Sequence, residues 1–439
     1  TTAWPMLALP LKQTKPVEWE KSLHRFVAQN YSDEVAEKHA RRFEEVHELR
    51  AKAIATATLS EKNASACREA LVKYHAVLQS MGSRFGASVE AHGRENLNVL
   101  FEWKDSFYAS FKSSQYDLRY ERAAVLWNLA AVFSFQGTMT KRDDAEGIKR
   151  SCHLFQQAAA VIDSVADIAR ACEWEACTVD LSTESLECMR QLMLAQAQKC
   201  FYEKAEMDGM RESIIAKIAQ HAAVLYDEVL TSMRKPKLKG NLDKGWPQVA
   251  EWQAVYFTAA AQWHAAADHL VAHQYGLQVG RLTVAHERLQ TLLKLAKTAP
   301  ADVLERYTSM ARKVATTHAE AARDNDTAYN ELVPAPKALP PIEGRAFAKP
   351  SAPPELEPHG ALPEDPFREL VPFEVMQEAS IFTSRVDDAV RDIKEAAHAH
   401  AQVVTAELDA MDLPQALQAC ETDNDIPGKL RIEIERVQR

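Results

Sequence analysis

The sequence has few residues that interrupt regular secondary structure. It contains 13 glycines and 19 prolines in 439 residues, about 7% of the chain, whereas an average protein carries roughly 12% of these two residues. Because glycine and proline mark turns, their scarcity favours long helices over many short strands. It also argues against collagen-like and disordered chains.

Long apolar runs are also missing. No stretch approaches the ~20 apolar residues that cross a bilayer as a helix, and the longest run, 123–133, already contains Asn128. The start of the chain, TTAWPMLALPLKQ, has a short apolar patch without a preceding basic region, so it does not resemble a signal peptide. The seven cysteines are odd in number and scattered, which indicates reduced thiols and a cytoplasmic protein.

Positive charge is in deficit. The 52 lysines and arginines face 62 aspartates and glutamates, which gives a net charge of −10. Nucleic-acid-binding proteins concentrate basic charge, so we expect no nucleic-acid partner. The sequence also lacks the G-x-S-x-G, P-loop, dinucleotide-binding and H-E-x-x-H motifs. We therefore expect no enzymatic activity, no cofactor and no small-molecule substrate.

Metal-ligating side chains occur in two weak patterns. A C-x4-C pair at positions 172 and 177 has no second pair at zinc spacing. The pairs His264/Asp268 and His269/His273 are each four residues apart on a predicted helix. Such pairs hold a metal only if a third ligand comes from elsewhere, and more often they form a solvated helix face. We predict no metal site.

Helical periodicity covers most of the first 330 residues and predicts an all-α fold. Ser32, and either Asp180 or Ser182, are predicted N-caps. Residues 120–137 and 146–165 resemble a tetratricopeptide helix pair, and any strands should lie within the first hundred residues or in 82–103. Predicted helices cover 17–31, 34–57, 60–78, 117–136, 142–169, 182–207, 211–234, 247–275, 277–297 and 301–328.

The segment 334–372 has a different composition, because it holds 11 of the 19 prolines. It must be extended, and it is either a linker or a strap laid over the helices. A strap would partly bury its apolar residues. Beyond it, 373–411 is predicted as one long helix whose apolar residues follow the 3,4 spacing of a coiled coil and need a partner. The strap's apolar residues are Leu339, Ile342, Phe347 and Leu362.

These changes in composition predict three parts: a helical domain over 1–333, an extended segment over 334–372 and a second helical domain that starts at 373. Within the first part, residues 185–222 carry more apolar side chains than one helix face holds. A surface helix usually shows one apolar stripe about 100° wide. Here Ile214 and Ile218 form one stripe beside a second stripe of Ile215, Ala219 and Ala222.

The excess of apolar residues in 185–222 has two interpretations. Either these helices are central and packed on both sides, or one stripe lines an exposed groove for a partner helix. A short turn around Asp208 and Gly209 would fold the two helices antiparallel and bring Phe201 close to Ile214.

Several strings together resemble the BRO-type (Bro-one) domain, best known from the Alix and PalA family of endosomal adaptors. They occur in the family's order over about residues 5–365, and LMLAQAQ followed by IIAK is the most specific pairing. The tail from residue 371 resembles the opening of the Alix V domain. The strings are FEWKDSF (101–107), YERAAVLWNLAAVFS (120–134), LMLAQAQKCF (192–201), SIIAKIAQHAA (213–223) and ARDNDTAYNELVP (322–334).

The resemblance implies a curved, banana-shaped helical rod with a tetratricopeptide-like core and a proline-rich strap. It implies a non-enzymatic scaffold that binds the C-terminal amphipathic helix of an ESCRT-III filament subunit on its concave face. Such adaptors act in multivesicular-body sorting, budding or membrane repair, and they are cytoplasmic proteins recruited to endosomal or other membranes. The alternative is a BRO-domain scaffold in another assembly, such as pH signalling, Rho signalling, a phosphatase complex or a structural complex.

The resemblance also assigns residues. The partner-binding patch falls on Phe201, Ile214 and Ile218, where the family often has Leu at the last position. Lys149 matches a basic residue beside the patch, whereas the expected acidic neighbour is replaced by Ala145.

Two further features of the family map onto the chain. Tyr329 matches a tyrosine in a second surface pocket that can be phosphorylated; alternatively, it only closes the last helix. Between Asp105 and Tyr120, Alix has an exposed, glycine-flanked loop that is linked to membrane or viral contacts. The segment ASFKSSQYD here is shorter and has no glycine, which puts that activity in doubt.

Overall fold

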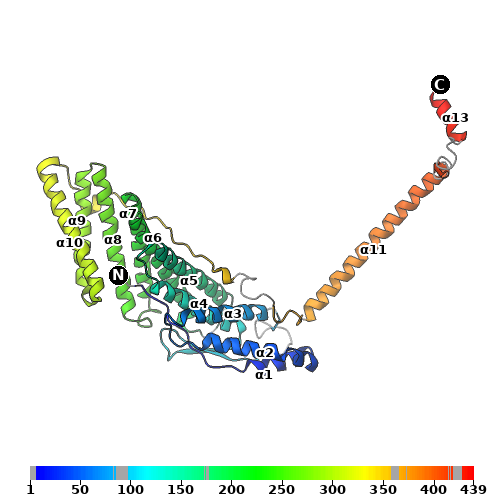
Figure 1. Cartoon of the computed structure of the whole chain (residues 1–439), viewed down its shortest axis with the longest axis horizontal. Coiled ribbons are helices and arrows are strands. Elements are labelled where there is room, and N and C mark those ends of the chain that lie inside the picture. Colours follow the sequence, from blue (N-terminus) through cyan, green and yellow to red (C-terminus); the bar gives the residue numbers. More distant parts are fainter. Residues whose placement is uncertain are drawn as a thin grey trace. The chain divides into compact units, whose positions relative to one another are not determined.

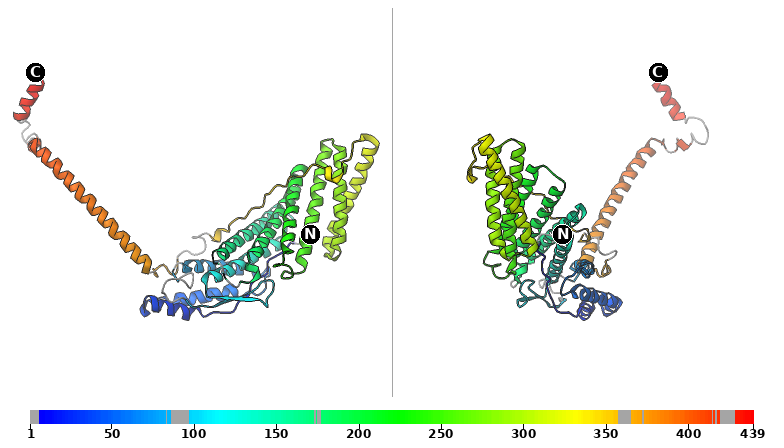
Figure 2. Two further views of the ribbon diagram at one scale, coloured as in Figure 1. Left: turned by 180° about the vertical axis from the view of Figure 1, so that it is seen from behind. Right: turned by 60° about the vertical axis from the view of Figure 1, so that its left-hand side comes forward.

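The computed structural model describes residues 6–82, 84–85, 97–172, 174, 177–356, 365–371, 373–413, 415, 417–418 and 428–439. The chain divides into two compact units, Thr1–Phe367 and Arg368–Arg439. In its described part, the first unit consists almost entirely of helices that follow one another along a curved, banana-shaped layer (Figures 1 and 2). The predicted all-α class is confirmed.

The first three helices form one end of this unit. Helix α2 begins where the sequence predicts, because the Ser32 side chain accepts a hydrogen bond from the Val35 backbone N–H at 3.2 Å. The apolar faces of the three helices bury large side chains, among them Trp19, Phe43 and Tyr74. The helices are α1 (Trp19–Asn30), α2 (Asp33–Ile54) and α3 (Ala64–Gly82).

A two-stranded antiparallel sheet follows, formed by β1 (Phe101–Lys104) and β2 (Lys112–Gln115). β1 overlaps the predicted stretch 82–103, whereas β2 falls in the segment compared above with a family loop and lies beyond the predicted limits. The position of the sheet depends on contacts with residues outside the strands. The buried Trp103 indole donates a hydrogen bond to Glu121 at 2.6 Å, and this bond ties β1 to the helical core.

The centre of the unit is the predicted tetratricopeptide-like pair, α4 (Leu118–Met139) and α5 (Ala145–Cys172). The two helices approach closely at Gly137, where a Cβ would meet the Phe155 ring at 3.0 Å. The remaining helices were also predicted within a few residues of their observed limits. They are α6 (Thr183–Met207), α7 (Glu212–Met233), α8 (Gly245–Val271), α9 (Tyr275–Leu295) and α10 (Ala301–Asp324).

The proline-rich segment 334–356 runs as an extended strap along the helices (Figures 1 and 2). Leu339, Ile342 and Phe347 are half-buried, which confirms a strap rather than a linker. The fourth predicted residue, Leu362, lies outside the described residues. The unit closes at Phe367, which is fully buried and packs on two aromatic rings of the first helices and the residues after them.

In the second unit, α11 (Phe373–Ala410) is the long predicted helix, and α13 (Gly428–Val437) follows it. The residues of the predicted apolar seam of α11 are exposed, among them Phe382 and Ile393, each 69% accessible. Among the described helices, none combines the length and apolar character that crossing a membrane requires. The domain limits at 333 and 372 stay predictions.

Candidate partner-binding surface

The α6–α7 hairpin carries the predicted patch. Helix α6 is capped by Ser182, whose side chain accepts from the Ser185 N–H at 3.4 Å, and it ends before a turn at Gly209. This glycine has a φ of +61°, a left-handed conformation that glycine adopts at little cost. The Met210 N–H closes the turn on the Ala205 carbonyl at 3.1 Å. The hairpin is antiparallel, as predicted.

The three predicted patch residues differ in their exposure to solvent. Phe201 and Ile214 are half-buried, whereas Ile218 is only 2% exposed. The predicted exposure of Ile218 is therefore wrong. Because residues three and four apart share a helix face, Ile218 joins Ile215 and Ala222 on the buried face of α7.

The strap contributes an aromatic side chain, Phe347, next to Phe201. The Phe347 ring lies 5.6 Å from the Phe201 ring, centroid to centroid, at an interplanar angle of 36°. The Arg345 guanidinium lies 5.0 Å from the centre of the Phe347 ring, within the range of a cation–π contact. Phe201 and Phe347 thus form a half-buried ring pair, and Ile214, which is also half-buried, lies near the start of α7. We call these three residues the hairpin–strap surface.

A single buried amide positions this part of the strap. Gln198 is fully buried, and its Nε2 donates to the carbonyls of Ile218 at 3.2 Å and Arg345 at 2.9 Å. Its Oε1 accepts from the backbone N–H groups of Phe347 at 3.0 Å and Ala348 at 3.1 Å. Every hydrogen-bonding site of the amide is used. Gln198 therefore connects α6, α7 and the strap behind the hairpin–strap surface.

Lys149 lies on α5 and is exposed. Its Nζ donates to the Glu146 carboxylate at 2.8 Å, and this hydrogen bond, with the charge of Glu146, raises the pKa of Lys149. The charge of the Asp208 carboxylate, at the end of α6, also contributes to the raised pKa of Lys149. The acidic partner of Lys149 thus comes from position 146 rather than from Ala145.

Tyr329 lies in a short π-helical turn, Asn325–Tyr329, after α10. It is 46% exposed, and its ring stacks on Tyr275 with a centroid distance of 3.4 Å and an interplanar angle of 7°. The ring therefore lies on the surface and joins the end of α10 to the start of α9.

The histidines in and just after α8 contact other protein groups. His264 is buried and its Nδ1 lies 2.5 Å from the Glu212 carboxylate. His269 and His273 instead contact Gln274 and Tyr275. Within the described residues, no three metal-ligating side chains come together.

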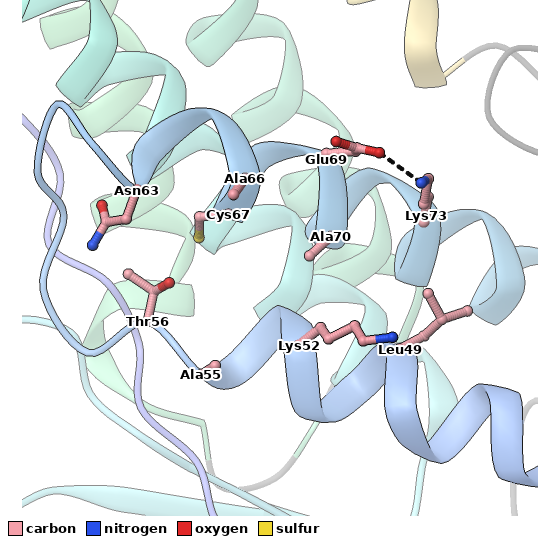
Figure 3. A pocket seen from close by; sticks show the side chains of 10 residues that line it. All are labelled: Leu49, Lys52, Ala55, Thr56, Asn63, Ala66, Cys67, Glu69, Ala70 and Lys73. Carbon is pink, nitrogen blue, oxygen red and sulfur yellow. Dashed lines mark hydrogen bonds and ion pairs between the residues drawn. The ribbon is translucent and has the colours of Figure 1, made fainter.

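The two described grooves have no arrangement of catalytic groups. One, of about 450 Å³, lies between α2 and α3 beside Cys67, and the Glu69–Lys73 ion pair lies on its rim (Figure 3). Burial raises the pKa of Cys67, which keeps it a protonated thiol at neutral pH. The other groove, of about 410 Å³, lies between α3, α4 and α5. Neither groove includes the hairpin–strap surface.

Residues 6–390 match the BRO1-like domain family. The chain belongs to this family. ALG-2 interacting protein X of Dictyostelium discoideum is 31% identical over 434 residues, which are 98% of this chain and 52% of that protein. The chain thus spans about half the length of this relative.

Solved structures show the same fold. ALIX in complex with the SIVmac239 PYKEVTEDL late domain superposes with a TM-score of 0.76 at 26% identity, over 94% of this chain and 58% of that one. The ALIX BRO1 domain in its complex with CHMP4C superposes with a TM-score of 0.71 at 26% identity, over 83% of this chain and 99% of that one. The Bro-one resemblance and the curved helical fold are confirmed.

The sequence predicted part of this surface. Phe201 and Ile214 were found through the family motif, whereas the family motif did not indicate the contribution of Phe347. The one usable signal was that Phe347 is a large aromatic residue in an otherwise extended, proline-rich segment. Gln198 is the second glutamine of LMLAQAQ, and its partners in the strap are too distant in sequence to be inferred.

Proposed function

We propose that this chain is a non-enzymatic scaffold that binds the C-terminal amphipathic helix of an ESCRT-III filament subunit on the hairpin–strap surface. The observation that carries the proposal is the half-buried ring pair of Phe201 and Phe347, whose strap backbone is fixed by the Gln198 amide, with the half-buried Ile214 on the next helix. Membership of the BRO1-like family and the likeness to the ALIX BRO1 domain bound to CHMP4C support it.

An amphipathic helix suits this surface physically. Two or three leucine or methionine side chains that cover it would each contribute roughly 1.5–3 kcal/mol from burial, before the cost of ordering the peptide is subtracted. The Arg345 guanidinium lies over the Phe347 ring and would attract an acidic group on the partner. Lys149, an exposed cation on α5, would add to this attraction. The chain would then act in the cytoplasm, recruited to endosomal membranes during multivesicular-body sorting, budding or repair.

The test is the affinity of the purified chain for a labelled peptide with the C-terminal helix of CHMP4C. Ile214→Asp would place an unpaired carboxylate in the contact, and we expect binding to weaken by about 3 kcal/mol, or more than 100-fold. Val224→Asp is the matched control, because Val224 is also on α7 and is 39% exposed. Equal affinities of the two variants would contradict the proposal.

A further inference from the structure

The connection between α7 and α8 concentrates positive charge. Residues 234–244, RKPKLKGNLDK, contain five basic side chains and one acidic side chain, although the whole chain has a net charge of −10. All five basic side chains are exposed to solvent. We call this segment the basic loop. Its basic residues are Arg234, Lys235, Lys237, Lys239 and Lys244.

Two buried leucines fix the basic loop to the helical body. Leu238 is completely buried, and Leu242 is 8% exposed. Backbone hydrogen bonds form successive turns around Leu238, whose N–H donates to the Lys235 carbonyl at 3.0 Å and whose carbonyl accepts from the Asn241 N–H at 3.0 Å. The Asn241 side-chain amide also donates to the Lys237 carbonyl at 2.9 Å. The backbone that carries the lysines is therefore ordered before a partner binds, which lowers the entropic cost of binding.

Two of the five basic side chains have an acidic partner within the chain. Arg234 Nη2 lies 3.1 Å from Glu251 Oε1 of α8. Lys237 Nζ lies 2.8 Å from Glu184 Oε2, in the first turn of α6. Within the described part of the chain the other three form no ion pair, so their charge is available to a partner molecule. These three are Lys235, Lys239 and Lys244.

We propose that the basic loop is a docking surface for an anionic phospholipid membrane. This inference deepens the proposed function and rests on it, because it names the part of the chain that touches the membrane to which the scaffold is recruited. Clusters of roughly four to eight lysines and arginines bind membrane surfaces that contain anionic lipids, and each such residue strengthens binding about fivefold. Salt screens charges beyond about 8 Å under physiological conditions, so the local excess of positive charge decides the attraction.

The composition and the place of the basic loop favour a lipid surface over a peptide or a nucleic acid. Sites for small ligands and helical peptides are concave, whereas this loop joins two helix ends, and neither of the two described grooves includes it. Four of its five cations are lysines, whose compact charge suits a diffuse negative surface, whereas bidentate recognition of single phosphates favours arginine. The loop also has no aromatic side chain on which unpaired bases could stack.

The basic loop and the hairpin–strap surface lie at opposite ends of α7. Ile214 is near the start of this helix, and Arg234 directly follows its last residue. An α-helix rises about 1.5 Å per residue, so about 30 Å separate these two positions. A chain that is docked to a membrane through the basic loop therefore keeps its hairpin–strap surface free, and the two binding events should be independent.

The test is co-sedimentation of the whole chain with vesicles of phosphatidylcholine and phosphatidylserine. The loop variant should bind these vesicles about 100-fold more weakly than the wild type, because it loses three lysines. The control variant removes the same charge from three exposed lysines elsewhere in the first unit and should bind like the wild type. The loop variant is Lys235→Gln, Lys239→Gln and Lys244→Gln, and the control variant is Lys62→Gln, Lys294→Gln and Lys337→Gln.

Several outcomes would overturn the inference. They are wild-type binding that is absent, equal on vesicles of phosphatidylcholine alone, or unchanged at high salt. Equal losses in the loop and control variants would show that net charge alone acts. Loss of binding in Phe111→Ser with the loop variant unaffected would place the contact on the exposed Phe111 of the β1–β2 connection. Binding of single-stranded RNA through the loop, without vesicle binding, would assign it to a nucleic acid.

A gain of binding provides a second test. Glu184→Gln removes the acidic partner of Lys237 and so releases a fourth lysine for the membrane. We expect this variant to bind the anionic vesicles about fivefold more strongly than the wild type. Unchanged or weaker binding would contradict the proposed contact.

The peptide assay separates this inference from the proposed function. The loop variant should bind the CHMP4C peptide with the affinity of the wild type, which also shows that the variant is folded. A wild-type chain that binds the peptide but no vesicles would overturn the docking surface alone. A chain that binds anionic vesicles through the basic loop but does not bind the peptide would overturn the proposed peptide site and support the docking surface.

Discussion

The strap and helix α11 differ in what holds them. The strap has no repeating backbone hydrogen bonds, yet Gln198 fixes its main chain and Phe347 packs on Phe201. Helix α11 has an unbroken helical backbone, yet residues of its apolar seam such as Phe382 and Ile393 are 69% exposed. Regular secondary structure alone therefore does not fix a segment against the rest of a domain. Buried side-chain contacts do.

The largest expected effect tests this comparison with two isoleucines. Ile218→Ala removes a side chain that is 2% exposed and should lower the free energy of unfolding of the first unit by about 3 kcal/mol. Ile393→Ala removes one that is 69% exposed and should change stability by less than about 0.5 kcal/mol. Urea unfolding of both variants measures the difference. A loss of less than 1 kcal/mol in unfolding free energy for Ile218→Ala would indicate that this side chain is exposed, as the sequence predicts.

A smaller effect tests what holds the strap. Gln198→Leu removes four hydrogen bonds and leaves the Ile218 carbonyl without this donor, so we expect a loss of about 2 kcal/mol in unfolding free energy. Amides of residues 345–348 should also exchange faster with solvent. Gln156→Leu is the control, because its side chain gives the strap a single hydrogen bond, to the Lys349 carbonyl at 2.9 Å.

If Gln198→Leu and Gln156→Leu lose the same stability and show the same exchange at 345–348, then the strap is held by apolar contacts such as Phe347. The buried amide would then have no special part in positioning it.

The helices and their caps could be predicted from the sequence because both are local properties. Ser32 caps α2 through an N–H three residues away, so no distant part of the chain has to be known. The strap could be recognised as extended for the same reason, since proline restricts its own backbone.

The burial of Ile218 could not be predicted, because this residue lies at the border between the two apolar stripes of α7. On an α-helix with 3.6 residues per turn, Ile218 is about 40° from Ile214 and about 60° from Ile215. Neighbouring helices decide which side of this border is covered, and the strap crosses there, since the Arg345 N–H donates to the Lys217 carbonyl at 3.0 Å. Such contacts join residues more than a hundred positions apart, and periodicity does not report them.

The smallest expected effect concerns a buried polar group that, unlike Gln198, has an atom without a hydrogen-bond partner among the described residues. His75 in α3 is 5% exposed, and its Nε2 has no hydrogen-bond partner among the described residues. Burial, with a further contribution from the charge of Arg122, lowers the pKa of His75 to about 3. The folded protein therefore keeps this ring neutral, whereas the unfolded chain binds a proton below about pH 6.5.

It follows that the stability contributed by neutral His75 is complete above about pH 6.5 and is lost as the pH falls from there toward 3. Between pH 7.5 and pH 5.5 we expect this histidine to lower the free energy of unfolding by about 1.4 kcal/mol. His75→Gln does not titrate, so the stability difference between wild type and variant should shift by that amount in favour of the variant, as measured by urea unfolding at the two pH values. An unchanged difference would mean that the buried imidazole gains a hydrogen-bond partner when it is protonated.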